Sequence, residues 1–556
     1  MQKTKDKKWR HSRKVIFWIM GVLTTIVLFA FVVGFILQNK MPDRIKNAIA
    51  DGSNGVYALD FATIHVNVLR GQLRVGKLHL IPDTNRYRQL KDKEQTAKLY
   101  DVTIDEVYLN GFQLLKFWLT HRIEIRDLQI RKPNIVQLVM RTEKQTNKRK
   151  ELVDDLPAAF RGGKIGSFSV GQLRFQVKNI KDSLQNSGWL ENINLDVKDV
   201  WLDSLALQDT SRYWFAKNIR VHGENIRYTV GTGVYKLQLK QLDISTEKKR
   251  LVMDSFRVIP AYSEKQWSTS LPYKQDRYDM LYPNITVTGI DFKRLQEKGS
   301  LLADSMTINR ARINIYADKG MPEKTTIASN NFPSLAFQRL GLPITVNQIK
   351  LRKTDVYYKE LNPKSGKSGL VFFKELEGNL LGVSNDTVRL QRNPWIKCHF
   401  STHFLGKPTL TLDLNFNMAD KNGAFNYTGA LTGAPASFYN QLLEPIALAR
   451  AEEGYIHAVR FQIEANRYGA NVTTEMLYND LKAAVLDASS GELEKKGFLS
   501  LFVNWLAIKT NNPSKKDEVA RVANHYYKHP QEKTFFNLMW KAVYSGLKVN
   551  VGLPNI

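Results

Sequence analysis

Few residues in this sequence could carry out covalent or metal chemistry, and they are scattered. Cys398 is the only cysteine, which excludes an intramolecular disulfide and a cysteine-based zinc site. It lies in the strand-like segment 396–400, so we interpret it as a packing residue rather than a nucleophile. His525 and His529 have the i, i+4 spacing of helical metal ligands, but no acidic partner accompanies them and Pro530 follows. A solvated helix face is therefore predicted for this pair.

Sequence motifs that signal catalysis or nucleotide binding are missing from the chain. There is no G-x-x-x-x-G-K-[ST], no G-x-G-x-x-G after a strand, no H-E-x-x-H and no G-x-S-x-G. We therefore expect a protein that is not an enzyme and that uses no cofactor and no metal ion.

The composition indicates a large folded protein with an anionic partner. The chain has 556 residues, which is too long for one hydrophobic core. Its 81 Lys and Arg against 53 Asp and Glu give a formal charge of +28. Such an excess favours lipid headgroups, nucleic acid or an acidic polymer as partner. A membrane anchor makes phospholipid the expected partner, with no role for nucleic acid.

The anchor is an uncharged run from Val15 to Leu37, long enough at about 1.5 Å per residue to cross a bilayer as a helix. The alternative, a cleaved signal peptide, is disfavoured because its apolar region is usually shorter and the nearest small-x-small site, 48–50, lies well beyond. Basic residues dominate 1–14, which places this tail in the cytoplasm and exports the remaining chain. The sequence thus predicts a single-pass protein of the inner (plasma) membrane with a periplasmic body.

An eight-residue pattern, Φ-x-Φ-x-x-Φ-x-Φ with Φ apolar, recurs through the body between short turns. The copies begin at Leu73, Val102, Ile123, Phe168, Leu195, Leu237, Ile285, Met306 and Ile344. The segments IEIRDLQIRKPNI at 123 and ITVNQIKLRKTDV at 344 agree in pattern over a longer stretch, including Arg131-Lys132 against Arg352-Lys353.

The octet has a specific physical consequence. Side chains alternate between the two faces of a strand, and the extra middle residue would send the second apolar pair to the opposite face. A β-bulge or tight kink is needed to return that pair to the first face. Each octet therefore predicts a bent strand, and successive bends curl the sheet into an apolar trough. At the octet of Ile285, we expect Val287 and Ile290 to point inward and Thr286 and Thr288 outward.

The predicted trough provides a set of candidate lipid-contacting side chains, all of them apolar members of the octets. They are Leu73, Val75, Leu78, Leu80, Val102, Ile104, Ile123, Ile125, Leu128, Ile130, Phe168, Val170, Leu173, Phe175, Leu237, Leu239, Leu242, Ile285, Val287, Ile290, Phe292, Ile308, Ile313, Ile344, Val346, Ile349 and Leu351.

The pattern changes towards the C-terminus. We expect a repetitive β-groove over 38–395, a β continuation over 396–490 and a helical cap over 491–556. In the cap, helical spacing relates Phe498 to Trp505 and Val519 to Tyr526, and 512–517 reads as a helix start with a capping box. A last apolar stripe runs through 535–547, and we expect it to pack against the end of the sheet, with docking on a membrane surface as the alternative.

These features together resemble the AsmA-like family of Gram-negative envelope proteins. The resemblance rests on the N-terminal apolar run, the repeated octets and the segments 478–482, 511–513 and 535–540. It implies an inner-membrane anchor and a periplasmic repeating β-groove, or β-taco, related to TamB and to chorein-type bridge proteins. It also implies a role in phospholipid transport or outer-membrane homeostasis, with a possible distal partner protein. This chain is shorter than the larger members, which leaves open whether it spans the periplasm alone.

The expected fold is mostly β, with one N-terminal transmembrane helix, an elongated and strongly curved antiparallel sheet that forms a groove, and C-terminal helices. The expected function is to shield acyl chains in that groove. A structural or scaffolding envelope protein that binds a partner protein is the alternative. A weaker third interpretation is an enzyme acting on extracytoplasmic polysaccharide or lipid, which would need a clustered carboxylate pair.

Overall fold

The computed structural model describes residues 41–553 except 91–97, 141–161, 180–187, 204–205, 207, 231–232, 323–330, 364–365, 488–493, 496–507 and 516–517. The chain divides into two compact units, one of residues 1–256 and 286–302, the other of residues 257–285 and 303–556. The predicted border at 395 is not a border between these units. We describe each unit by itself.

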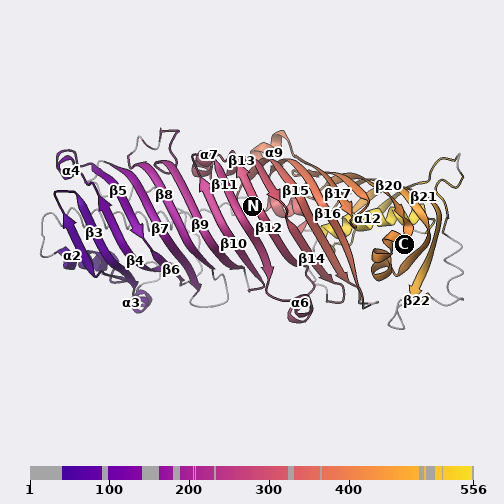
Figure 1. Ribbon diagram of the computed structural model, residues 1–556, viewed down its shortest axis with the longest axis horizontal. Coiled ribbons are helices and arrows are strands. Elements are labelled where there is room, and N and C mark those ends of the chain that lie inside the picture. The colour runs from indigo at the N-terminus through magenta and orange to yellow at the C-terminus, as the bar shows by residue number, and fades with distance from the viewer. Residues whose placement is uncertain are drawn as a thin grey trace. The chain divides into compact units, whose positions relative to one another are not determined.

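Unit 1 is built on a sheet whose strands follow the chain order (Figure 1). Its strands are β1 (Tyr57–Asp60), β2 (Thr63–Asn67), β3 (Gln72–Pro82), β4 (Lys98–Asn110), β5 (Ile123–Arg131), β6 (Asn134–Val139), β7 (Gly163–Asn179), β8 (Gly188–Trp201), β9 (Ala216–Val230) and β10 (Tyr235–Ser245). Its helices are α2 (Met41–Gly52), α3 (Thr84–Gln89), α4 (Leu114–Thr120) and α7 (Phe292–Lys298). Strands β1 and β2 both pair with β3, and β3 pairs with β4. Strands β5 and β6 both lie between β4 and β7, and β8, β9 and β10 then follow one beside the other.

The predicted bends are present in unit 1. The fifth octet residue has a positive φ in the copies that begin at Leu73, Phe168 and Leu195, where it is Lys77 (55°), Gln172 (56°) and Asp199 (54°). In the copy at Ile123 the positive φ follows the octet, at Lys132 (47°), which separates β5 from β6. Side chains other than glycine rarely adopt this conformation, so each bend is a specified feature of the backbone.

Neighbouring strands satisfy the backbone amides that these bends remove from the regular ladder. Lys132 donates its amide hydrogen to the Gly171 carbonyl at 2.8 Å. The amide of Gln172 donates to Asn194 Oδ1 at 3.0 Å. An unpaired backbone amide inside a sheet costs free energy, so these acceptors help to stabilise each bend.

Unit 2 contains the remaining sheet strands and several short helices. Its strands are β14 (Arg312–Asp318), β15 (Ile344–Leu361), β16 (Ser368–Ser384), β17 (Trp395–Phe404), β18 (Thr409–Asn417), β19 (Phe425–Pro435), β20 (Ala449–Asn466), β21 (Gly469–Asp487), β22 (Glu494–Lys495) and β23 (Val522–Lys528). Strands β11 (Arg250–Pro260), β12 (Arg277–Thr288) and β13 (Leu301–Asn309) carry residues of both units. The helices are α6 (Glu264–Ser270), α8 (Pro333–Gln338), α9 (Thr387–Arg392), α10 (Asn440–Leu442) and α12 (Phe535–Asn550), with helical turns at Ala436–Tyr439 and Leu443–Ala447.

The same bends recur in unit 2. Arg310 has a φ of 54° between β13 and β14, and Lys353 has a φ of 48° within β15. The amide of Lys353 donates to Glu377 Oε1 at 3.0 Å, and the amide of Glu375, another bend with a φ of 51°, donates to Asp355 Oδ1 at 3.1 Å. Lys353 occupies the place of Lys132 in the thirteen-residue match, so that match marks a shared backbone conformation.

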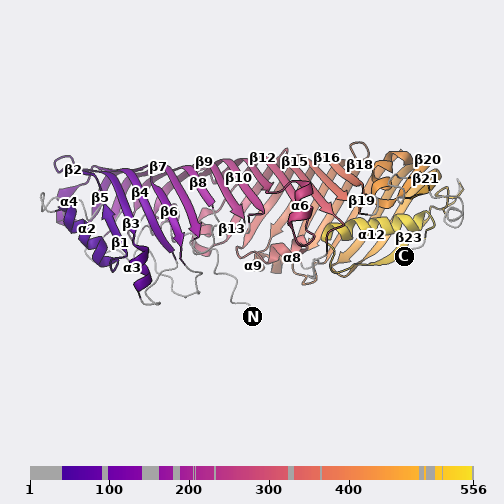
Figure 2. The same cartoon turned by 90° about the horizontal axis from the view of Figure 1, so that it is seen from below.

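Helix α12 packs on the β17–β23 part of unit 2 and forms its main core (Figure 2). The stripe predicted over 535–547 is buried only in part: Phe535 is buried, Met539 and Val543 are partly buried, and Phe536 (58% exposed) and Trp540 (37% exposed) face outward. The buried apolar side chains of α12 are Phe535, Leu538 and Ala542. They lie among the side chains of β17, β19, β20 and β21, which include the buried Cys398. Burial raises the pKa of the Cys398 thiol to about 12, in agreement with a packing residue.

The predicted helix over 512–526 is wrong. Residues Val522–Lys528 form strand β23, which pairs with β21 in antiparallel order. Asn512, expected to cap a helix, is 1% exposed and donates from Nδ2 to the Met476 carbonyl at 2.6 Å. The i, i+4 apolar spacing is also an even spacing, so it suits one face of a strand equally well. Of the helical cap predicted over 491–556, the described residues contain one helix, α12. The helix predicted over 498–505 lies outside the described residues.

The expected solvated face at His525 and His529 is also wrong. His529 is 2% exposed, and the ring of His525 lies within 2.8 Å of Ser545 Oγ on α12. Burial lowers the pKa of both imidazoles. In each ring Nδ1 is buried and has no hydrogen-bond partner among the described residues.

The expectation of a purely antiparallel sheet is corrected in two places. Strand β7 runs parallel to β5 and β6, and β15 runs parallel to β14. A parallel neighbour requires a long connection, and the chain is long enough for one between Val139 and Gly163 and between Asp318 and Ile344. The sheet is therefore mixed, although most pairs are antiparallel.

The transmembrane prediction for Val15–Leu37 lies outside the described residues. Within the part of the chain that the structure describes, no helix has both the length and the apolar character needed to cross a bilayer.

We expect Gln172→Val to destabilise unit 1 by about 1–2 kcal/mol, because a β-branched residue strongly disfavours a left-handed backbone. Arg174→Val is the matched control, since Arg174 is equally exposed on the same strand but has no positive φ. Urea unfolding of the two variants measures the difference, and equal stabilities would contradict a strained bend at Gln172.

We expect the C-terminal part of unit 2 to lose stability as the pH falls from about 7.5 to 5.5. The folded state binds protons at His525 and His529 less readily than the unfolded state, so protonation through the ordinary histidine pKa of about 6.5 favours unfolding. The double variant His525→Gln/His529→Gln should show a smaller change between these pH values. An unchanged pH dependence of hydrogen-exchange protection in β23, after correction for intrinsic rates, would count against this prediction.

Candidate functional site: the apolar lining of the bent strands

The octet side chains of unit 1 share one face, as the bends require. In β4 the four apolar octet residues are at most 1% exposed. They are Val102 and Ile104, which precede the two middle residues of the octet, and Val107 and Leu109, which follow them. The corresponding residues of β3 and β5 belong to the same apolar cluster. The apolar lining is therefore one surface to which both limbs of each strand contribute.

The structure places every candidate lining residue in a buried or partly buried position. The buried ones are Leu73, Val75, Leu78, Val102, Ile104, Ile123, Ile125, Leu128, Ile130, Phe168, Val170, Leu239, Ile285, Val287, Ile290, Phe292 and Val346. The partly buried ones are Leu80, Leu173, Phe175, Leu237, Leu242, Ile308, Ile313, Ile344, Ile349 and Leu351.

The octet of Ile285 departs from a bent strand in its second half. Strand β12 ends at Thr288, Gly289 adopts a φ of 66°, and Phe292 begins helix α7. Val287 (9% exposed) and Ile290 (3%) are buried as expected, whereas Thr286 and Thr288 are partly exposed. Phe292 packs edge-to-face on Tyr213, with ring centroids 6.0 Å apart, so it supports a loop rather than the lining.

The lining of unit 1 is sealed at its first strands and accessible at its later ones. The octet side chains of β3, β4 and β5 other than Leu80 are almost completely buried, whereas Leu237, Leu242 and Ile244 of β10 remain partly exposed. Gly223 of β9, opposite Leu242, leaves space that the Ile193 side chain occupies. Apolar surface is therefore available to a ligand at β9 and β10.

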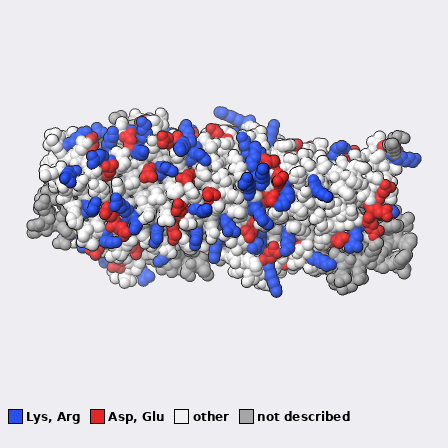
Figure 3. All heavy atoms as spheres, in the orientation of Figure 1, with Lys and Arg blue, Asp and Glu red and all other residues white. Residues whose placement is uncertain are grey.

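The opposite face of the same strands carries charged side chains. Asp105 lies 3.2 Å from Lys77 Nζ and 4.0 Å from Lys132 Nζ, so one carboxylate joins two bend residues across three strands. On the face shown in Figure 3, basic and acidic side chains are interspersed along the strands. Such exposed ion pairs add little stability, but they keep this face hydrated and give the sheet one polar and one apolar side.

Unit 2 repeats this division. On β15, Asp355 and Tyr357 face the outer side, where the Lys374 ammonium contacts both, at 2.7 Å from Asp355. By alternation, Tyr358 and Glu360 project to the inner side. Partly exposed apolar side chains such as Ile313 of β14 and Ile349 of β15 lie along this unit's lining, and helix α12 covers the lining over β17–β23.

A polar cluster interrupts the lining of unit 2. Glu360 Oε2 accepts a hydrogen bond from the Tyr358 hydroxyl at 2.9 Å and lies 3.1 Å from Lys319 Nζ. Burial raises the pKa values of Asp276 and Tyr358. Burial and the nearby Lys319 ammonium lower the pKa of Lys541 on α12. These groups are therefore desolvated, and two lysines of the cluster lie near one another.

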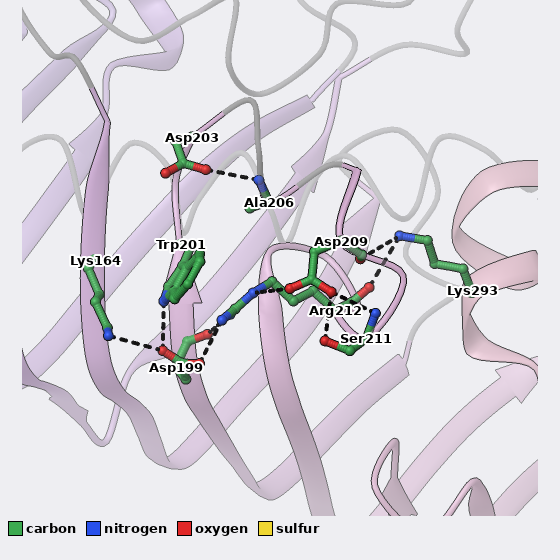
Figure 4. A network of polar contacts seen from close by, with 9 residues as sticks. All are labelled: Lys164, Asp199, Trp201, Asp203, Ala206, Asp209, Ser211, Arg212 and Lys293. Carbon is green, nitrogen blue, oxygen red and sulfur yellow. Dashed lines mark hydrogen bonds and ion pairs between the residues drawn. The ribbon is translucent and has the colours of Figure 1, made fainter.

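A second polar network, in unit 1, joins two carboxylates through one buried arginine (Figure 4). The Arg212 side chain is 4% exposed, and its guanidinium contacts Asp199 Oδ2 at 2.7 Å and Asp209 Oδ2 at 3.0 Å. It also lies 3.8 Å from the centre of the Trp201 ring. Burial acts to raise the pKa of Asp199, but hydrogen bonds from Arg212 and Trp201 outweigh it and hold that pKa below its ordinary value. Both carboxylates are thus ionised partners of one cation, which is unlike a catalytic acid–base pair.

The segments that carry the family resemblance meet in unit 2. The amide of Asn512 donates to the Tyr478 carbonyl at 2.8 Å, and the amide of Asp480 donates to Asn511 Oδ1 at 2.9 Å. The Tyr427 hydroxyl donates to the Met539 carbonyl of α12 at 2.9 Å. These residues hold the C-terminal segment and α12 against β19 and β21, a structural role that their separation in the sequence had concealed.

Among the described residues, no three His, Cys, Asp or Glu side chains are placed to hold a metal ion. No protein-family model matches the chain, and no curated protein shows significant similarity to it.

We expect Arg212→Leu to destabilise unit 1 by about 2–3 kcal/mol, because it leaves Asp199 without its buried cation and removes charge-assisted hydrogen bonds. Arg220→Leu is the control: Arg220 also faces a carboxylate, Asp243, but its side chain is 67% exposed, so a change within about 0.5 kcal/mol is expected. Denaturant unfolding compares the two variants. An Arg212→Leu variant as stable as the wild type would refute a stabilising role for Arg212.

Proposed function

We propose that this protein is a membrane-anchored, periplasmic lipid-binding protein that shields phospholipid acyl chains on its apolar lining and takes part in envelope lipid homeostasis. The observation that supports this function best is the accessible part of the lining at β9 and β10. Leu237, Leu242 and Ile244, which the octet pattern assigns to the inner face, remain partly exposed, whereas the octet residues of β4 are buried. A soluble protein gains by covering such surface, and acyl chains provide the matching chemistry.

The energetics favour such a ligand without any catalytic step. Each methylene group that moves from water to an apolar surface contributes about 0.8 kcal/mol of favourable free energy. An acyl chain that lies along several strands keeps most of its methylene groups out of water. The inner face supplies apolar contacts, while the outer face, with ion pairs such as Lys77–Asp105, stays in water.

The polar cluster of unit 2 supports a phospholipid rather than a wholly apolar ligand. Lys319 and Lys541 lie on the inner side of this unit, and Glu360 is already engaged by Lys319 and Tyr358. An anionic headgroup would neutralise the charge of the Lys541 ammonium, so the cluster suits the polar end of an amphipathic molecule.

The decisive experiment places a photo-crosslinking amino acid at Leu242 in the full-length, detergent-purified protein, with Lys240 as the matched outer control on the same strand. Lys240 is exposed, and the octet pattern predicts its side chain on the outer face, across a bend from Leu242. Mass spectrometry of the crosslinked protein should find phospholipid attached at Leu242 and none at Lys240.

Other outcomes separate the competing functions. Lipid captured at Lys240 but not at Leu242 would reverse the assignment of the two faces. Capture of a protein partner at Leu242, with no lipid at either position, would replace lipid binding with the scaffolding function.

A further inference from the structure

Four large apolar side chains in unit 1 are exposed to an unusual degree. Leu69 is 99% exposed, Leu115 and Leu119 are each 75% exposed, and Trp118 is 59% exposed. Single exposed leucines are ordinary, but four such residues on two short segments form a surface that we call the α4 patch.

The two segments of the α4 patch lie beside one another. Leu69 is in the turn between β2 and β3, and the Gly71 carbonyl of that turn accepts a hydrogen bond from the Phe112 amide at 3.0 Å. A Cβ at Gly71 would lie 2.3 Å from the Phe112 carbonyl oxygen, so glycine permits this close approach. Phe112 lies two residues before the first residue of α4, which brings the turn against the start of that helix.

Helix α4 presents its outward side chains from a fixed position. Its inner residues Leu114 and Phe117 pack on the core of unit 1, and the rings of Phe117 and Phe112 are 5.8 Å apart. The Gln113 amide donates to the Glu124 carbonyl at 2.9 Å, and Lys116 Nζ lies 2.5 Å from Glu124 Oε1. These contacts fix the position of α4 on unit 1, so that its other face, with Leu115, Trp118 and Leu119, points to solvent.

The same edge of unit 1 receives the chain from the predicted anchor. Helix α2 begins at Met41, four residues after Leu37, where the apolar run ends. It is held at this edge by an ion pair between Lys46 and Asp60 at 2.6 Å and by the Lys46 ammonium 5.2 Å from the centre of the Phe61 ring. Figure 2 shows α2 and α4 on the side of unit 1 that carries its first strands, and Figure 1 shows them at opposite ends of those strands.

The chemistry of the α4 patch matches the interfacial region of a bilayer. Leucine and tryptophan are the side chains that enter this region, and tryptophan prefers the level of the headgroups. Exposed basic residues next to the patch, Arg70, Lys116 and Arg122, suit anionic lipids. Of the three, Lys116 and Arg122 also pair with carboxylates, so the apolar contact is the main contribution.

We propose that the α4 patch inserts into the headgroup region of the membrane that anchors the chain. This surface would hold the first strands of unit 1 against the bilayer, at the edge where α2 enters the fold. The inference rests on the anchored topology in the proposed function, but it does not depend on lipid binding at Leu242.

Site-directed spin labelling of the full-length protein in proteoliposomes of phosphatidylethanolamine and phosphatidylglycerol tests this inference. Cys398 is 3% exposed, so a Cys398→Ala background leaves one introduced cysteine as the labelling site. The label is placed at Leu119→Cys in one protein and at Val388→Cys in the control, where the native valine is 64% exposed on helix α9.

The label at Leu119→Cys should collide more often with oxygen than with a water-soluble nickel chelate, and the label at Val388→Cys should show the reverse. Preferential collision with the nickel chelate at both positions would overturn membrane insertion. Strong spin–spin broadening at Leu119→Cys alone would also overturn it, because the α4 patch would then contact a second copy of the chain.

A charge variant gives an independent readout. Leu115→Glu/Leu119→Glu should expose a label at Leu69→Cys to the nickel chelate while leaving the protein in the carbonate-resistant membrane fraction. An unchanged oxygen preference at Leu69→Cys would contradict the proposal. Loss of the wild-type protein from that fraction would refute the anchor in the proposed function, whereas missing lipid crosslinks at Leu242 would refute lipid binding alone.

Discussion

The fold depends on one backbone constraint, which is that two apolar pairs separated by two polar residues must share a face of the sheet. Strict alternation would turn one pair towards water, and the chain avoids this by a left-handed residue or a kink near the middle of the strand. Lys77, Gln172 and Asp199 occupy that position in unit 1, and Arg310 occupies it between β13 and β14. Burial of the lining and hydration of the outer face follow from this local choice.

Much of this arrangement could be predicted from the sequence because period-two patterning and a strand bend have direct consequences for burial. The apolar octet residues are buried or partly buried, as the pattern predicts. The stripe predicted for α12 coincides with its buried face at Phe535 but not at Phe536 and Trp540, which are exposed. The parallel neighbours β7 and β15 could not be predicted, because the octet says nothing about the crossovers that precede them. The acceptors of the bend amides, such as Asn194 and Glu377, were missed for a related reason: they lie on the neighbouring strand, so only pairing reveals them.

The C-terminal errors have a clear physical origin. Spacings of four residues satisfy both a helix face and a strand face, and the segment around Val522 and Tyr526 was short enough for either. Tertiary structure decides the matter here, because β21 offers a free edge with which β23 pairs. The pair His525 and His529 then comes to lie on the strand beside α12, where burial replaces the expected hydration.

The side-chain acceptors at the bends also bear on how a repetitive sheet avoids misfolding. Strands built from one octet have similar apolar patterns, so the hydrophobic effect alone distinguishes poorly between correct partners and slipped or exchanged ones. The bends add a requirement that differs from strand to strand: Gln172 needs the amide oxygen of Asn194, Lys353 needs the carboxylate of Glu377, and Glu375 needs that of Asp355. A slipped register would remove the acceptor from each of these amides, so these contacts favour the correct pairing of strands whose apolar patterns are alike.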